Sequence, residues 1–307
     1  MMDREPVDAA LRRPGYTPEQ KRRLRLIREV KAYGASRLGL RDTGSYETLY
    51  DTRGRPIAWN LVACPPDSVR PRLWHFFIVG TLPYIGFFDR ADAEREEALC
   101  RARGDDTLLR PVAAYSTLGW FSDPVLTTML DDDDAELAEL ILHEMTHGTV
   151  FHKGHGDFNE SLATFTGEEA AVLFLKDRDG EGAASVRAAR TGIADARRFA
   201  GWVEETWAAL RNYYAQSMPR AEKIAGRQAV FDRARRSFDA ILFETGGYRG
   251  YLDRRPLSNA FVAAHHDYTS HTGLFEAVVA RHPQGLRGLI ELASRPAAVD
   301  DPVKYLR

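Results

Sequence analysis

The chain has 307 residues, 44% of them hydrophobic, and a formal net charge of −2. Length and composition predict a globular protein with a sizeable core, in one large domain or two closely joined lobes. The near-neutral charge gives no chain-wide bias toward nucleic acid or an anionic membrane. No apolar run approaches the ~20 residues of a membrane span, and two cysteines, Cys64 and Cys100, exclude a disulfide scaffold.

The N-terminal region divides into a leader and a helix. Residues 1–16 lack the apolar core of a signal peptide, so we expect a mobile leader and a cytoplasmic protein, unless an export leader has been trimmed. Thr17 as N-cap and Pro18 in the first turn predict a helix over residues 17–38. Its apolar stripe would consist of Leu24, Ile27 and Val30.

Residues 44–125 are typical of strands and loops. Runs rich in β-branched and aromatic residues predict strands at 57–63, 73–79 and 108–117. Pro111 suits an edge strand, so residues 112–118 could offer an edge to which an extended peptide substrate is added. Tyr115 would then help to stabilise a developing oxyanion; the alternative is an ordinary core or edge aromatic.

The most informative stretch is Asp131–Lys176, in which residues 143–147 read HEMTH. Its acidic start, residues 131–134, favours a helix N-terminus. On a helix, His143 and His147 lie on one face and can reach a single metal ion, with Glu144 beside them. A catalytic zinc has three protein ligands and an open position for water. The pattern therefore predicts two ligands and a general base, unless it occurs by chance.

The third ligand must come from elsewhere in the chain. A metzincin would place Gly and His where this chain has Val150 and Lys153, so that pattern fails. Glu160 is our preferred candidate, because it begins a second helical run that can pack against the first and return to the histidine pair. The residues considered are His152, His155, Asp157 and Glu160.

The sequence resembles a known family at these positions. HEMTH, FNESLATF (158–165) and AYSTLGWFSDPVLTTML (114–130) resemble the bacterial putative aminopeptidases, which are zincin-like proteins of the gluzincin type. The resemblance runs from about residue 20 to 293, with landmarks GSYETLYD (44–51), IAWNLVACP (57–65), YIGFFD (84–89) and LSNAF (257–261). It implies a peptidase with one zinc ion held by His143, His147 and Glu160, and Glu144 as general base.

Two features depart from well-known gluzincins. The chain has no GAMEN-like stretch, which binds a free amino terminus in gluzincin aminopeptidases. Thr164 stands where thermolysin-like members carry an Asp that orients a zinc-bound His. The resemblance thus implies an altered zinc site, or an orienting partner supplied elsewhere, such as Glu168 or Glu169.

The C-terminal region is predicted to be helical. After a polar break at 177–183, residues 184–245 predict two long helices packed as a hairpin, followed by shorter helices. Tyr268 and His266 are candidates for substrate contact, and a proton donor from this region could serve the tetrahedral intermediate. The alternative is a satisfied or surface role for each residue of the cluster Asn259, His265, His266, Tyr268 and His271.

These observations predict an α+β, predominantly helical and zincin-like fold, with a small mixed sheet on the HExxH helix. We expect a catalytic lobe over residues 17–176 and a helical lobe over 177–307 that completes the cleft. The predicted function is a zinc-dependent, aminopeptidase-like enzyme acting on a peptide or small amide. The alternatives are a zinc hydrolase of another amide, and a non-catalytic zinc-containing scaffold, whose ion would have four protein ligands.

Overall fold

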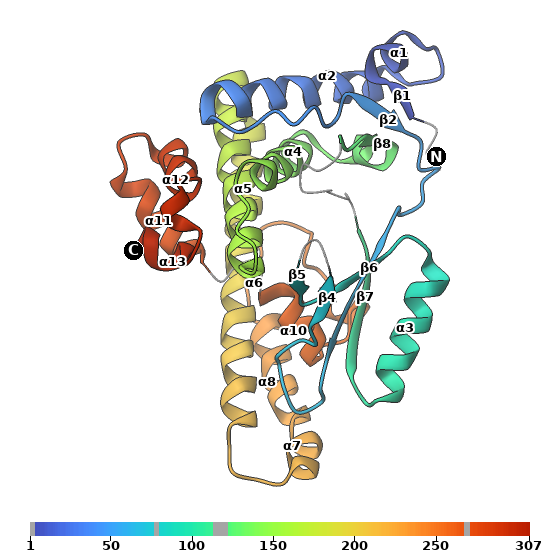
Figure 1. The fold of residues 1–307 in the computed structure, drawn as a ribbon, viewed down its shortest axis with the longest axis vertical. Helices are drawn as coiled ribbons and strands as arrows, with labels where there is room; N and C mark the ends of the chain where they lie inside the picture. The colour runs from blue at the N-terminus through green and yellow to red at the C-terminus, as the bar shows by residue number, and fades with distance from the viewer. Residues whose placement is uncertain (1–3, 77–79, 113–121, 267–270) are drawn as a thin grey trace. The chain divides into compact units, whose positions relative to one another are not determined.

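The computed structural model describes residues 4–76, 80–112, 122–266 and 271–307 (Figure 1). Over these residues the chain is α+β and mainly helical, as predicted. It divides into two compact units: unit 1 comprises residues 1–57, 112–189 and 271–307, and unit 2 comprises 58–111 and 190–270. This division differs from the boundary expected after residue 176, because each unit combines segments that are far apart in the sequence.

Unit 1 contains secondary structure where a mobile leader was expected. Strand β1 (Arg4–Pro6) pairs antiparallel with β2 (Thr48–Tyr50), which pairs parallel with β8 (Val125–Leu126). Helix α1 (Val7–Arg12) buries Val7 and Ala10. The expectation was wrong because these elements are stabilised by strand pairing with residues more than 40 positions away, which no local pattern reveals.

Helix α2 (Pro18–Tyr33) begins where the sequence predicts. The Thr17 hydroxyl accepts a hydrogen bond from the Gln20 amide, and the Gln20 side chain accepts one from the Thr17 amide, which completes a capping box. The helix buries the predicted stripe of Leu24, Ile27 and Val30. It continues as a π-helical turn, η1 (Gly34–Leu38).

The centre of unit 1 is a pair of helices, α4 (Asp134–Thr149) and α5 (Gly156–Asp179). Asp133 caps α4 in a second capping box with Glu136. The main packing partners of α4 are α5 and α2 rather than the expected mixed sheet, which is present in unit 1 as β1–β2–β8. The remaining elements of unit 1 are η2 (Thr127–Asp131), α11 (Thr272–Arg281), α12 (Gly285–Ala293), η3 (Pro296–Ala298) and α13 (Pro302–Leu306).

Unit 2 combines antiparallel sheets with helices. Strand β3 (Trp59–Cys64) lies between β6 (Ile85–Phe87) and β7 (Asp106–Pro111), with helix α3 (Arg90–Ala102) packed on this sheet. β7 is an edge strand of the described sheet and ends at Pro111, whereas the substrate-binding edge predicted at residues 112–118 lies, apart from Val112, outside the described residues. A separate hairpin is formed by β4 (Trp74–Phe76) and β5 (Gly80–Leu82).

The helical region of unit 2 departs from a simple hairpin. Helix α6 (Ala184–Tyr214) has its first residues in unit 1 and the rest in unit 2. The expected second long helix is divided into α7 (Arg220–Gly226) and α8 (Gln228–Asp239), followed by α9 (Tyr251–Arg254) and α10 (Asn259–His266).

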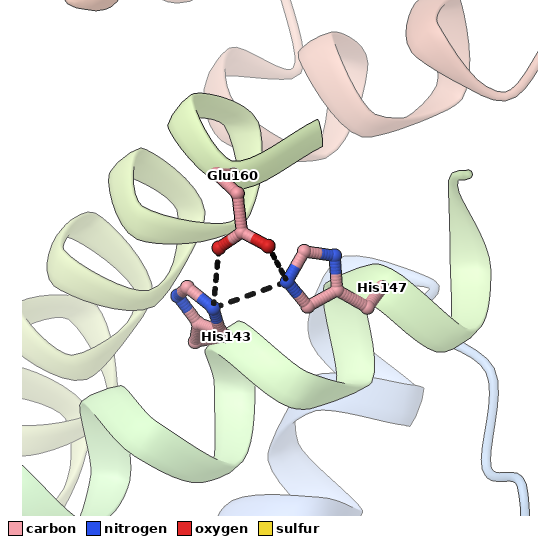
Figure 2. A group of neighbouring side chains, drawn as sticks. All are labelled: His143, His147 and Glu160. Carbon is pink, nitrogen blue, oxygen red and sulfur yellow. Dashed lines mark hydrogen bonds and ion pairs between the residues drawn. The ribbon is translucent and has the colours of Figure 1, made fainter. Parts of the chain in front are cut away.

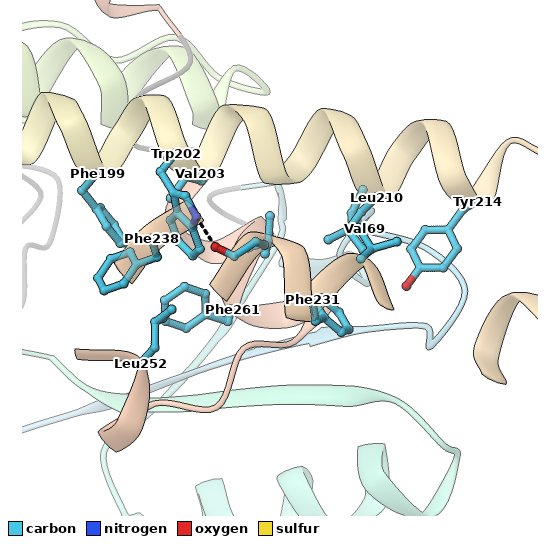
Figure 3. Close-up of a cluster of buried hydrophobic side chains, with 13 residues drawn as sticks. Val69, Phe199, Trp202, Val203, Leu210, Tyr214, Phe231, Phe238, Leu252 and Phe261 are labelled. Atoms are coloured by element: carbon cyan, nitrogen blue, oxygen red, sulfur yellow. Dashed lines mark hydrogen bonds between the residues drawn. The ribbon is translucent and has the colours of Figure 1, made fainter. Parts of the chain in front are cut away.

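An aromatic core joins these helices. Figure 3 shows Phe199 and Trp202 of α6 against Phe238 of α8 and Phe261 of α10. The Trp202 indole donates a hydrogen bond to the Ala234 carbonyl at 2.8 Å, so burial leaves its N–H satisfied. No helix in the described ranges has the length and apolar character needed to cross a membrane.

Candidate metal centre

Helix α4 brings two histidine rings together. The Nε2 atoms of His143 and His147 lie 3.1 Å apart, and the rings meet edge to face with centroids 4.8 Å apart. This follows from their four-residue spacing, which places both side chains on one face of the helix.

Helix α5 adds a carboxylate to this pair (Figure 2). The Glu160 oxygens lie 3.8 Å from His143 Nε2 and 3.7 Å from His147 Nε2. Tetrahedral zinc with bonds of about 2.0–2.1 Å would separate its ligand atoms by about 3.3–3.4 Å. The three observed separations lie on either side of this value, so the donor set and spacing fit a zinc ion.

The electrostatics of the site also fit a cation. Burial, helped by neighbouring His147, lowers the pKa of His143 to about 3, so its ring is neutral at pH 7 and has a lone pair to offer. At His147 burial acts in the same direction, but the hydrogen bond and charge of Glu160, with the charge of Glu144, raise the pKa overall. The two carboxylates therefore attract positive charge to the histidine pair.

Gly167 permits the close approach of the two helices. A Cβ atom there would lie 2.8 Å from the Glu139 carbonyl oxygen and 3.2 Å from His143 Cβ. Any side chain at this position would push α5 away from α4 at His143. Gly167 was not among the residues expected at this site, although a glycine inside a helix costs about 1 kcal/mol relative to alanine and therefore suggests a packing role.

The other third-ligand candidates are engaged elsewhere. His152 Nε2 donates to the Ala293 carbonyl at 3.0 Å, and Asp157 pairs with His271 at 3.4 Å. The Asn159 side chain holds both backbone groups of His152, at 2.8 and 2.9 Å. Within the described ranges, the cluster that could hold a metal consists of His143, His147 and Glu160, and it does not include His155.

We expected a hydrogen-bond partner that would orient the ring of a zinc-bound histidine, and at His147 the described residues do not provide one. Its Nδ1 atom is buried and has no hydrogen-bond partner in the described part of the chain. Within the described ranges, Thr164, Glu168 and Glu169 therefore do not orient the His147 ring through a hydrogen bond to Nδ1.

Two other site predictions lie outside the described residues: Tyr115 and Tyr268. His266 is described and belongs to unit 2. It pairs with Glu204 at 2.9 Å and stacks on Trp207 with centroids 4.3 Å apart. These contacts engage the His266 side chain without requiring a substrate.

A small cavity adjoins Glu144 within unit 1. Its wall includes side chains from α2, from the loop before β2, from the segment before β8 and from α4. No sequence pattern indicates this cavity, because its residues come from segments up to 117 positions apart. The polar members of the wall are Lys31, Asp42, Ser45, Tyr46, Asp123 and Glu144.

Comparison with curated proteins and with solved structures finds no match. A family model described as "Putative aminopeptidase" matches residues 1–301, which is nearly the whole chain. This agrees with the resemblance seen in the motifs around the histidine pair. The chain belongs to the putative aminopeptidase family.

Proposed function

We propose that the chain is a zinc-dependent peptidase of the gluzincin type that acts as an aminopeptidase. The observation that carries this proposal is the convergence of His143, His147 and Glu160, from consecutive helices, beside Glu144. Two histidines and one glutamate form a ligand set typical of catalytic zinc, which keeps a position open. The family match supports peptidase activity.

In this proposal each residue of the chain has a distinct role. His143, His147 and Glu160 would hold the ion, which when bound would act as a Lewis acid on the scissile carbonyl and lower the pKa of water. Glu144 accepts the proton of the attacking water on its carboxylate and delivers it to the leaving amine. Tyr115 and Tyr268 remain candidates for the oxyanion donor.

Metal analysis tests the ligand set. We expect about one zinc per chain in the wild type and its loss in Glu160→Ala, because two histidines alone leave the ion without a third protein ligand. Asp157→Ala removes a neighbouring carboxylate that pairs with His271, so it serves as the matched control and should retain the metal. Full zinc content in Glu160→Ala would refute the assignment.

Peptide hydrolysis tests the mechanism. Glu144→Gln should bind zinc like the wild type and lose activity by about 10²- to 10⁴-fold, because the amide cannot accept the water proton. A panel of peptides and other amides identifies the bond that is cleaved. Wild-type rates in Glu144→Gln would refute the role of Glu144, and activity on non-peptide amides alone would favour a different zinc hydrolase.

A further inference from the structure

A side-chain amide closes the connection between the two helices of the candidate metal centre. Residues 150–155 join α4 to α5. The Asn159 side chain is buried and reaches back across this connection. Its Nδ2 donates to the His152 carbonyl at 2.8 Å, and its Oδ1 accepts from the His152 amide at 2.9 Å. These two hydrogen bonds, which we call the Asn159 clamp, use the donor and the acceptor of the amide together and so fix its orientation.

The backbone of the same segment reinforces the Asn159 clamp. The His155 amide donates to the His152 carbonyl at 3.1 Å, and the Asn159 amide donates to the His155 carbonyl at 3.0 Å. Glu160 follows Asn159 directly in the first turns of α5 and extends its carboxylate toward the histidine pair (Figure 2). The clamp therefore determines where the helix that carries Glu160 begins relative to the end of α4.

The His152 ring connects the clamp to the C-terminal helices of unit 1. The ring is buried, and its Nε2 donates at 3.0 Å to the carbonyl of Ala293, which lies 141 positions away. Ala293 is the last residue of α12, where a helix leaves its carbonyls without partners of its own. The ring also meets Phe158 edge to face, and Phe158 meets Phe275 of α11 in the same way. The segment between the two metal-binding helices is thus held by α5 on one side and by α11 and α12 on the other.

The candidate metal centre needs such support because its third ligand comes from the second helix. The Glu160 oxygens lie 3.7 and 3.8 Å from the histidine Nε2 atoms, and a displacement of about 0.5 Å is enough to impair a site of this kind. Asn159 offers no ligand atom of its own, since its amide oxygen and nitrogen both bind the His152 backbone. Its contribution to the centre is therefore the placement of Glu160.

We propose that Asn159, anchored through His152 to the end of α12, is a positioning residue that holds Glu160 in place for the metal and sets how tightly zinc is retained. The inference rests on the proposed function and deepens it, because it identifies residues outside the ligand set that control the metal. A carboxylate that is already in place loses little conformational freedom on binding, so the ion binds more tightly and leaves more slowly. The C-terminal end of α12 thereby becomes part of the support of the metal centre.

The variant Asn159→Asp separates positioning from electrostatics without requiring turnover. Aspartate has nearly the same size, but an oxygen replaces the amide nitrogen and faces the His152 carbonyl, so the clamp loses its donor. The variant also adds a negative charge next to Glu160, which by itself would strengthen the binding of a cation. We expect zinc affinity to be about 10- to 100-fold weaker than in the wild type, measured by competition with a chromogenic chelator. Equal or tighter binding would overturn the inference.

The matched control is Asn259→Asp. Asn259 is also buried, and its amide donates to the Pro65 carbonyl and accepts from the Tyr214 hydroxyl within unit 2. This substitution removes the same kind of donor, so it should lower the melting temperature while zinc affinity stays at the wild-type value. All affinities are measured below the lowest melting temperature of the set. An equal loss of zinc affinity in the two variants would show a general effect of destabilisation and would contradict the positioning role.

Two substitutions of His152 test the anchor, and they still decide the question if Asn159→Asp does not fold. His152→Leu keeps the clamp, which uses backbone atoms of this residue, and removes the donor to the Ala293 carbonyl. His152→Gln restores a side-chain N–H of similar reach. Zinc should dissociate about 3- to 10-fold faster from His152→Leu than from the wild type, and at close to the wild-type rate from His152→Gln. A wild-type rate in His152→Leu would overturn the inference.

The outcomes distinguish this inference from the proposed function. If the wild type binds no zinc, the proposed function fails and the inference fails with it. If the wild type binds zinc and Glu160→Ala loses it, while Asn159→Asp keeps the wild-type affinity, the zinc site stands and the positioning role of Asn159 is refuted.

Discussion

The two units treat their buried polar groups differently. In unit 2, the Asn259 side chain donates to the Pro65 carbonyl and accepts from the Tyr214 hydroxyl, both at 3.0 Å. Arg227 forms two hydrogen bonds of 2.8 Å with Asp106. In unit 1, buried polar atoms of His147 and Thr166 have no hydrogen-bond partner in the described ranges. Unit 2 uses these polar groups to hold elements together, whereas unit 1 also contains buried polar atoms, one of them on the predicted zinc ligand His147, that no described residue satisfies.

The largest loss of stability should come from breaking the buried ion pair of Asp106 and Arg227 in unit 2. Asp106→Asn leaves the Arg227 guanidinium without a charged partner in a site where both side chains are mostly buried. We expect a loss of about 3–5 kcal/mol in the free energy of unfolding, measured by urea denaturation. The exposed pair of Asp67 and Arg220 gives the control, since Asp67→Asn should cost less than about 1 kcal/mol.

Acid should destabilise the protein through His265 of unit 2. Burial lowers its pKa to about 4, from 6.5. Between these two pH values the unfolded state binds more protons, so stability falls as the pH drops, by up to about 1.4 kcal/mol per pH unit. Above pH 6.5 this residue should have no effect. Unfolding curves from pH 7.5 to 4.5 measure the slope, which His265→Gln should reduce; an equal slope in this variant would contradict the assignment.

In unit 1, Gly167→Ala should separate the two helices of the candidate metal centre. The added Cβ meets the backbone of α4, which cannot turn aside like a side chain. We expect a loss of about 1–3 kcal/mol in stability and a zinc affinity that is about 10- to 100-fold weaker. Gly201→Ala in α6, where nothing lies within 4 Å, is the control. It should stabilise the protein by about 0.5–1 kcal/mol, and a similar gain in Gly167→Ala would disprove the packing role.

The smallest effect should come from the N-cap of α2 in unit 1. Thr17→Ala removes the acceptor for the Gln20 amide at the start of α2. Stability should fall by about 1 kcal/mol, with unchanged zinc content. Thermal melting and elemental analysis together check this, and a loss of zinc would show that α2 influences the centre more directly than its cap suggests.

Local signals in the sequence determined the starts of α2 and α4 and the pairing of His143 with His147. Capping residues and the four-residue period act within one or two helical turns, so neighbouring residues suffice to predict them. No local pattern indicated β1 and α1, or the break between α7 and α8.

Only the tertiary structure decided which of four candidates meets the histidines. Glu160 reaches them because α5 begins at Gly156 and packs on α4 at Gly167, while Asn159 holds the intervening loop. Likewise, Tyr46 and Asp123 become neighbours only through backbone contacts between distant segments. The sequence alone therefore determined which chemistry is available, and long-range packing decided which side chains share a site, because that depends on contacts between residues with no fixed spacing along the chain.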